Sequence, residues 1–315
     1  MEAVLNKRER MLALANGQKA DIVPAAFFLH FDPADHTGQA AVDKHLAFFR
    51  QTGMDFVKIQ LEQATPPAGN IRRPEDWAHA PLYPDSFFEA PVGVAAGLVK
   101  AAKAEALVIM TIYSPFMWAK HVTSDPVLTA HLKENPEAVR KGLEIMTENV
   151  RRLVRGCKLA GVDGFYISTQ GGEAGHFDET GIFEDVIKPA DLAVWDEARG
   201  CAFNILHVCD YNGPYDDLGP FLDYPGDVVN CSLKVAGREL SPREASAMFG
   251  RPFMGGMERL GVLATGPLDA IRRAAEDVLA KAPKRFILGA DCTVPSDTPW
   301  ENLEAAIDSA HQHQP

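Results

Sequence analysis

The stretch PEAVRKGLEIMTENVRRLVRGCKLAGVDGFYIS, residues 136–168, decides the fold. It opens with a proline at a helix-starting position and carries apolar residues every three or four positions as far as a glycine. The short apolar run DGFYIS (163–168) follows at once and reads as a strand buried on both faces. A long amphipathic helix that leads directly into such a strand indicates an α/β protein with a parallel sheet.

Seven further apolar runs resemble 163–168, and helical patterns separate most of them. The eight expected strands are 22–29, 55–60, 106–112, 163–168, 203–208, 227–232, 252–256 and 285–290. Eight strands alternating with helices predict a single (β/α)8 TIM barrel over residues 1–315, with a doubly wound open sheet as the alternative. An N-terminal helix precedes the barrel, and the proline-rich segment 63–86 predicts a long loop after strand 2.

Charge and cysteine content narrow the class of protein. The chain has 315 residues and a net charge of −12, from 43 acidic residues and 31 lysines and arginines. Such a surface repels phosphate backbones, so we expect neither nucleic acid nor an anionic membrane as partner. There is no secretory leader and no long apolar run, which predicts a cytoplasmic protein. The five scattered cysteines are an odd number, so reduced thiols are expected.

The most informative spacing is H-x-C at the end of the fifth expected strand. His207 and Cys209 are two residues apart and therefore project from the same face of that strand. Cys292 lies just past the eighth expected strand, and the carboxyl ends of all barrel strands open onto one mouth. One imidazole and two thiolates match a zinc site with an open position. Cys231, at the end of the sixth expected strand, is a rival third ligand, and buried apolar cysteines are the plain alternative.

A fourth ligand would come from the loops around the mouth. Glu62 follows the second expected strand, and Glu173 lies in a glycine-rich loop after the fourth. Both are candidates, although a solvated loop carboxylate is the simpler interpretation of each. Asp210 adjoins the motif but points away from Cys209 in an extended strand.

Several polar residues at strand ends are candidates for work on a substrate. His30 and Asp32 have i, i+2 spacing at the end of the first expected strand and predict a general acid–base pair. Tyr166 is the third candidate catalytic residue. Substrate contacts are expected from residues of the barrel mouth, namely Ser168, Gln170, Met257 and Glu258.

Three segments resemble the uroporphyrinogen decarboxylase superfamily. They are NKRERMLALANGQKADIVPA (6–25), LHVCD (206–210) and ILGADCTVPSDTPWENLEAAIDSA (287–310). The resemblance implies a (β/α)8 barrel. The superfamily includes zinc-dependent methyltransferases that act between corrinoid proteins and thiols, and that branch carries an H-x-C…C zinc motif. His207, Cys209 and Cys292 match the motif, so the resemblance favours Cys292 over Cys231.

The decarboxylase branch holds its polycarboxylated tetrapyrrole with arginines just after the first strand. The corresponding stretch here, FFLHFDPADHTGQ (27–39), has no arginine, although carboxylates need charge-matched donors. We therefore expect a Zn²⁺-dependent methyltransferase that uses a small-molecule thiol or methyl donor. Any corrinoid would be carried by a separate partner protein, and the chain would be a monomer or homodimer. The alternatives are a decarboxylase of a carboxylated tetrapyrrole and a non-enzymatic binding module with a structural zinc.

Overall fold

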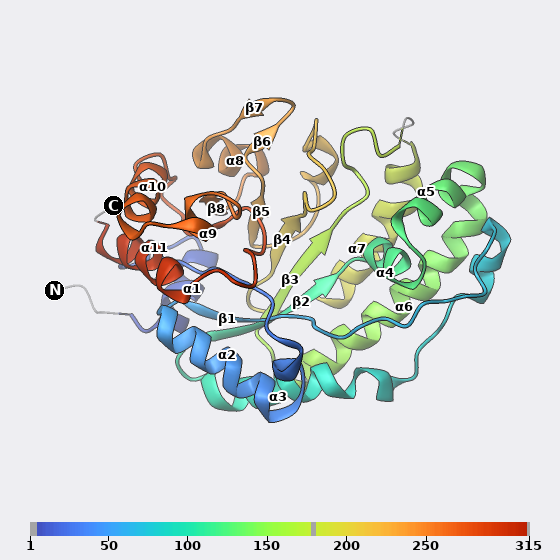
Figure 1. The fold of residues 1–315 in the computed structure, drawn as a ribbon, viewed down its shortest axis with the longest axis horizontal. Coiled ribbons are helices and arrows are strands. Elements are labelled where there is room, and N and C mark those ends of the chain that lie inside the picture. The colour runs from blue at the N-terminus through green and yellow to red at the C-terminus, as the bar shows by residue number, and fades with distance from the viewer. Residues whose placement is uncertain (1–4, 178–180, 314–315) are drawn as a thin grey trace.

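A curled, parallel sheet of seven strands forms the centre of the protein (Figure 1). The computed structural model describes residues 5–177 and 181–313. Each strand runs parallel to its neighbours in the sheet. In spatial order the strands are β1 (Phe56–Ile59), β2 (Leu107–Tyr113), β3 (Gly164–Thr169), β4 (Ile205–Val208), β5 (Val228–Cys231), β8 (Phe253–Met257) and β9 (Phe286–Ala290). Every one of them lies within one or two residues of an expected strand.

The first expected strand, 22–29, is the exception, and the prediction of eight strands is corrected to seven. This segment makes only an isolated bridge, between Ala25 and Leu288 of β9. Ala25 also accepts a hydrogen bond from the Asp55 amide (2.9 Å), so the segment lies between β9 and the start of β1. No ladder forms there because Pro24 has no N–H and the Ala25 amide donates to the Asp55 carboxylate (2.7 Å).

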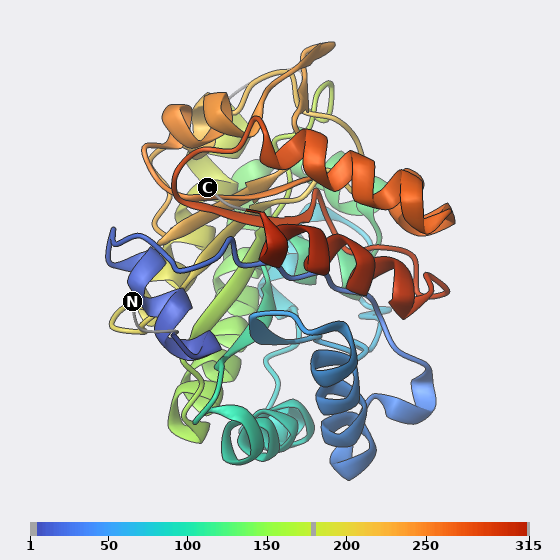
Figure 2. The same cartoon turned by 90° about the vertical axis from the view of Figure 1, so that its left-hand side faces the viewer.

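Helices lie around the outside of the sheet (Figures 1 and 2). The longest, α6 (Pro136–Ala160), is the helix of residues 136–168: Asn135 caps its start, and Gly161 ends it with φ 91°. The α10 and α11 helices lie side by side in both views. The other α-helices are α1 (Lys7–Ala15), α2 (Gly38–Thr52), α3 (Glu89–Ala102), α4 (Pro115–Val122), α5 (Asp125–Glu134), α7 (Lys188–Glu197), α8 (Pro242–Phe249), α9 (Val262–Thr265), α10 (Leu268–Leu279) and α11 (Trp300–Gln312).

Short elements fill the connections. The long connection after β1 contains two 3-10 helices, η2 (Pro74–His79) and η3 (Asp85–Phe88). The first lies within the expected loop 63–86, and the second begins at its end. The remaining short elements are the helical turns η1 (Pro33–Asp35), η4 (Phe183–Ile187) and η5 (Gly219–Phe221), and the antiparallel pair β6 (Lys234–Val235) and β7 (Arg238–Glu239). None of the helices in the described ranges combines the length and apolarity needed to cross a bilayer.

The expected N-terminal helix, α1, covers the amino ends of the strands. Arg8 makes two hydrogen bonds to Asp163, just before β3 (2.7 and 2.8 Å), and Arg10 contacts Asp55, just before β1 (2.6 Å). Glycine is required where β3 begins, since a Cβ on Gly164 would lie 1.7 Å from the Phe203 carbonyl oxygen. The opposite, carboxyl ends of the strands remain free to carry a site.

The register brings polar residues together near those carboxyl ends. Ser168 of β3 pairs with His207 of β4, and His207 pairs with Asn230 of β5. Because paired residues in adjacent parallel strands share a face, these three side chains lie at one level on the concave side of the sheet.

Candidate metal centre

The end of β4 presents the first two candidate ligands. His207 is buried within β4, and Cys209 follows directly after that strand. The Cys209 amide donates to the Thr169 carbonyl (3.0 Å), which extends the pairing with β3 by one step. Both side chains therefore point to the same side, as the i, i+2 spacing predicts.

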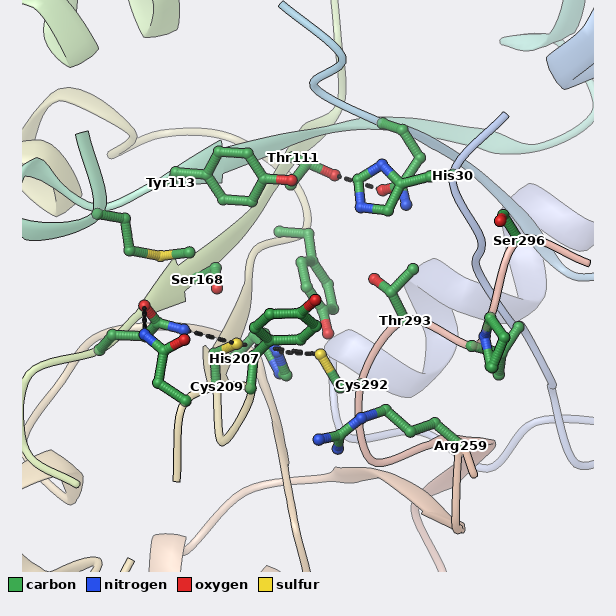
Figure 3. A pocket seen from close by; sticks show the side chains of 18 of the residues that line it. His30, Thr111, Tyr113, Ser168, His207, Cys209, Arg259, Cys292, Thr293 and Ser296 are labelled. Carbon is green, nitrogen blue, oxygen red and sulfur yellow. Dashed lines mark hydrogen bonds between the residues drawn. The ribbon is translucent and has the colours of Figure 1, made fainter. Parts of the chain in front are cut away.

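Cys292 reaches the same point from β9. The Asp291 amide donates to the Met257 carbonyl (2.9 Å), so the pairing with β8 continues past Ala290 and fixes the following residue. The Cys292 Sγ lies 3.9 Å from the Cys209 Sγ and 3.3 Å from the His207 Nε2. Figure 3 shows the three side chains converging on one point at the floor of the pocket.

The spacing of these three donors fits a zinc ion. All three ligand atoms lie within 4.8 Å of one another, and all three residues are buried. Bond lengths of about 2.3 Å to sulfur and 2.05 Å to nitrogen place tetrahedral S–S neighbours about 3.8 Å apart and S–N neighbours about 3.6 Å apart. The distances of 3.9 and 3.3 Å are close to those edges. His207, Cys209 and Cys292 therefore suit three corners of a tetrahedron, with the fourth open.

Cys231, the rival third ligand, lies on the other face of the sheet. It pairs with Val208, whereas its neighbour Asn230 pairs with His207 and faces the concave side. Burial raises the pKa of the Cys231 thiol to about 12. That thiol is an apolar packing group, and no donor cluster within the described residues includes it.

Neither candidate fourth ligand lies in the cluster. Glu62 instead contacts His30 (Oε2 to Nδ1, 2.9 Å) and accepts from the Phe31 amide (3.3 Å). Glu173 accepts from the Gly171 amide (2.6 Å), and burial raises the pKa of its carboxyl group to about 7. Gln170, which is outside the cluster, contacts one of the thiols: its Nε2 donates to the Cys209 Sγ (3.3 Å).

Hydrogen bonding makes the two thiols unequal. The hydrogen bond from Cys292, followed by the charge of His207, holds the pKa of Cys209 well below its usual range. The same contact with Cys209 raises the pKa of Cys292. The two thiols thus lose a first proton readily and a second proton with difficulty. Binding of a divalent cation to both sulfurs would favour loss of the second proton.

Arg259 ties together the two chain segments that carry the thiols. Its Nη1 contacts Asp210, the residue after Cys209 (2.7 Å), and Asp291, the residue before Cys292 (3.0 Å). Asp210 is thus turned away from the thiols, as expected for its strand position. The ion pairs hold the two segments at a fixed separation.

A cavity of about 790 Å³ opens above the three donors. Of the expected site residues, it is lined by His30, Tyr166, Ser168, Gln170, His207, Cys209 and Cys292. Met257 and Glu258 line a neighbouring cavity of about 440 Å³ instead. Glu258 is there paired with Lys234 (2.8 Å), so neither residue borders the metal cluster.

The expected pair of His30 and Asp32 is not formed. The chain turns at Pro33, and the exposed Asp32 carboxylate caps that turn by accepting from the Ala34 amide (3.0 Å). The partner of His30 is Glu62, 32 residues further along the chain. The Tyr166 hydroxyl donates to the Asn230 Oδ1 (2.5 Å), so this group is held by β5, which lies on the far side of β4 from β3.

Sequence reasoning missed four polar residues around the site: Lys58, Gln60, Thr111 and Asn230. The first three line the large cavity. Lys58 and Gln60 alternate with apolar residues in DFVKIQ (55–60), and this period of two was the signal that both face the interior. Asn230 donates to the Met254 and Ala290 carbonyls (2.9 Å each), linking β5 to β8 and β9.

A family model described as uroporphyrinogen decarboxylase (URO-D) matches residues 53–313. That range contains all three candidate metal ligands. A search of curated protein sequences finds no match to this chain.

Solved structures show the same fold at low identity. A methyltransferase from Methanosarcina mazei superposes with a TM-score of 0.76 and 15% identity, over 97% of this chain and 98% of the other. A B12-independent methionine synthase from Shewanella sp. W3-18-1, in complex with selenomethionine, gives 0.57 and 11%, over 92% and 97%. A putative vitamin-B12 independent methionine synthase from Listeria monocytogenes gives 0.54 and 13%, over 85% and 84%.

Proposed function

The chain belongs to the uroporphyrinogen decarboxylase (URO-D) family, and we propose that it is a zinc-dependent methyltransferase within that family. The observation that carries the proposal is the near-tetrahedral spacing of His207, Cys209 and Cys292 at the floor of a large cavity. The similar structures include a methyltransferase and a B12-independent methionine synthase, which agrees with this assignment.

The proposed reaction moves a methyl group to a thiol. A bond forms between the thiol sulfur and the methyl carbon, the bond from that carbon to the donor breaks, and its electron pair leaves with the donor. The thiol proton goes to solvent. Zinc, when bound, would promote the loss of that proton, because a thiol that coordinates zinc is deprotonated at neutral pH.

The residues of the chain would position the metal ion and the substrate. His207, Cys209 and Cys292 would hold the ion and leave the corner that faces the cavity open. Gln170 donates to the Cys209 sulfur and fixes its orientation. Ser168, which lines the cavity beside His207, would contact the substrate, and His30 lines the cavity as a member of the His30–Glu62 pair.

The donor that we propose is an activated methyl group, such as a methylated corrinoid carried by a partner protein. The acceptor is a small-molecule thiol that enters the cavity. We further propose that residues 22–29 take the place of an eighth barrel strand, since they hydrogen-bond on both sides. The five free cysteines suit a reducing cytoplasm, where the chain would act as a monomer or homodimer.

A decarboxylase of a carboxylated tetrapyrrole is the second candidate, because the family carries that name. It requires cations that are free to bind several carboxylates. Among the described residues that line the large cavity, the lysines and arginines are Lys58, Lys120 and Arg259. Arg259 is already paired with two aspartates and Lys120 with Asp125, which leaves one cation for several carboxylates. The cavity therefore favours the methyltransferase.

Metal analysis followed by a methyl-transfer assay tests the proposal. We expect about one zinc per chain, lost in Cys209→Ser and in Cys292→Ser but kept in Cys201→Ser, whose thiol lies outside the cluster. Methylcobalamin mixed with a panel of small thiols should lose its methyl group only with the zinc-loaded protein, followed by its visible absorption. Full activity in metal-free protein would overturn the proposal.

A further inference from the structure

Lys58 is a buried lysine in the wall of the large cavity. It lies in β1, between the apolar residues Val57 and Ile59, and only 5% of its surface is exposed. Its side chain nevertheless lines the cavity that also contains the three candidate metal ligands. A lysine is rarely buried in this way unless a partner or a ligand compensates its charge.

The groups that contact the Lys58 ammonium directly are neutral. Nζ makes a short hydrogen bond to the Gln60 Oε1 and lies 4.4 Å from the centre of the Phe28 ring and 4.6 Å from that of Tyr166. Gln60 is itself fixed, because its Nε2 donates to the Leu29 carbonyl (3.1 Å). An ammonium has three N–H donors, so one hydrogen bond leaves donors free on the cavity side.

The other two buried cations among the described residues, Arg10 and Lys188, are paired with carboxylates. Arg10 contacts Asp21 and Asp55, and Lys188 contacts Glu184 and Asp223. No such ion pair is found for Lys58 within residues 5–177 and 181–313. Burial accordingly lowers the pKa of Lys58 to about 7. The charges of Cys292, Glu62 and Cys209 act on Lys58 only from a distance. The cavity thus contains a buried lysine that no carboxylate of the described residues contacts.

Lys58 lies close to the metal cluster but makes no hydrogen bond to its ligands. One side chain, Tyr166, contacts both: its ring centre is 4.6 Å from the Lys58 Nζ and 4.9 Å from the centre of the His207 ring. The ammonium and the imidazole are therefore separated by no more than this one ring. A short molecule can reach both the open corner of the metal cluster and Lys58.

We propose that Lys58 is the anion-binding residue of this cavity and that the thiol acceptor is a small mercapto-carboxylate. Its carboxylate accepts hydrogen bonds from the Lys58 ammonium, while its sulfur lies at the open corner beside His207, Cys209 and Cys292. The inference rests on the proposed function for the sulfur end of the ligand. For the carboxylate end of the ligand, the inference depends only on Lys58, which has no carboxylate partner. Charge-assisted hydrogen bonds in a desolvated cavity are strong, so such a contact would favour binding.

Ligands matched in size but not in charge test the inference. Calorimetry on zinc-loaded protein would compare 3-mercaptopropanoate with 3-mercaptopropanamide. We expect the carboxylate to bind about tenfold more tightly or better. In Lys58→Met, which has similar bulk and no charge, the two ligands should bind within about twofold of each other. Lys188→Met, the same change at a buried lysine outside the cavity, should keep the preference.

Equal binding of acid and amide by the wild-type protein would overturn the inference, and so would a preference that survives in Lys58→Met. Loss of zinc from Lys58→Met with an unchanged preference would also overturn it, since Lys58 would then only balance the thiolate charge. Propanoate and propanamide, titrated into metal-free protein, separate the two proposals. A Lys58-dependent preference for propanoate there supports the anion site even if no methyl transfer is found.

Discussion

The sulfur atoms of Cys209 and Cys292 lie 3.9 Å apart, although 83 residues separate them in the chain. Two strands that end at the same edge of the sheet bring them together, β4 for Cys209 and β9 for Cys292. His207 completes the group, with its Nε2 3.3 Å from the Cys292 sulfur. This closeness predicts that folding and metal binding are coupled, because the unfolded chain has no comparable site.

Zinc should therefore stabilise the wild-type protein. At a free zinc concentration of about 100 times the dissociation constant, the free energy of unfolding should rise by about 2.7 kcal/mol relative to protein in excess chelator. Urea unfolding with and without zinc measures this difference. Cys292→Ser should show almost no difference, while Cys201→Ser should behave as wild type. Equal stabilisation of Cys292→Ser would place the metal elsewhere.

Arg259 should support metal affinity without touching the metal. It pairs with Asp210 and Asp291, whose side chains are only 14% and 18% exposed. Arg259→Met leaves these two carboxylates facing each other without a cation, so the segments carrying the thiols should separate. We expect zinc affinity to fall by about 10–100-fold, in line with other groups that orient metal ligands.

Competition with a chromogenic chelator measures that affinity. Arg238→Met is the matched control, because Arg238 is an exposed arginine paired with the exposed Glu244. Its zinc affinity should stay within about twofold of wild type. An unchanged affinity in Arg259→Met would show that the strands alone position the thiols.

The fold was largely predictable from the sequence because buried parallel strands are continuous apolar runs of restricted length. Seven of the eight expected strands are present. Residues 22–29 are equally apolar, but a strand also needs a hydrogen-bonded ladder. Pro24 has no donor, and the Ala25 amide bonds to a side chain, Asp55. The apolar character of a segment does not show which acceptors its backbone N–H groups will bond to.

The site was predictable where it depends on residues close in the sequence. Spacing along one strand placed His207 and Cys209 on one side, and the strand-end position of Cys292 placed it at the same edge. The pairing of His30 depended on Glu62, 32 residues away, which no local pattern indicates. The same limit hid Asn230, whose three hydrogen-bond partners come from three other strands.

Asn230 should be a major contributor to stability. Its amide donates to the Met254 and Ala290 carbonyls and accepts from the Tyr166 hydroxyl, and the side chain is fully buried. Asn230→Ala removes three hydrogen bonds to buried groups of other strands. We expect a loss of about 2–4 kcal/mol in the free energy of unfolding, measured by urea denaturation of metal-free protein.

Tyr166→Phe tests whether the shared hydrogen bond accounts for part of that loss. It removes one hydrogen bond and should cost about 1 kcal/mol. The double variant should lose less than the sum of the two single losses, because both substitutions break the same contact. Strict additivity would contradict a direct Tyr166–Asn230 interaction.

Asp191 predicts an unusual pH dependence of stability. It is buried in α7, where the Thr169 and Tyr224 hydroxyls both donate to its Oδ2, while its Oδ1 has no partner among the described residues. Burial raises the pKa of this carboxyl group to about 7. In the unfolded chain an aspartate loses its proton near pH ~3.9. Between these values the folded state holds a proton that the unfolded state has lost, so stability falls as the pH rises from about 4 to 7.

Asp191→Asn keeps the shape of the side chain and removes this titration. The stability of Asp191→Asn relative to wild type should therefore increase as the pH rises from about 4 to 7 and remain constant above that, a change of roughly 2–4 kcal/mol. Urea unfolding at a series of pH values between these limits measures it. Asp196→Asn, at an exposed aspartate of the same helix, should show no such trend. A constant difference between Asp191→Asn and wild type would mean that Asp191 is already ionised in the folded protein at pH 4.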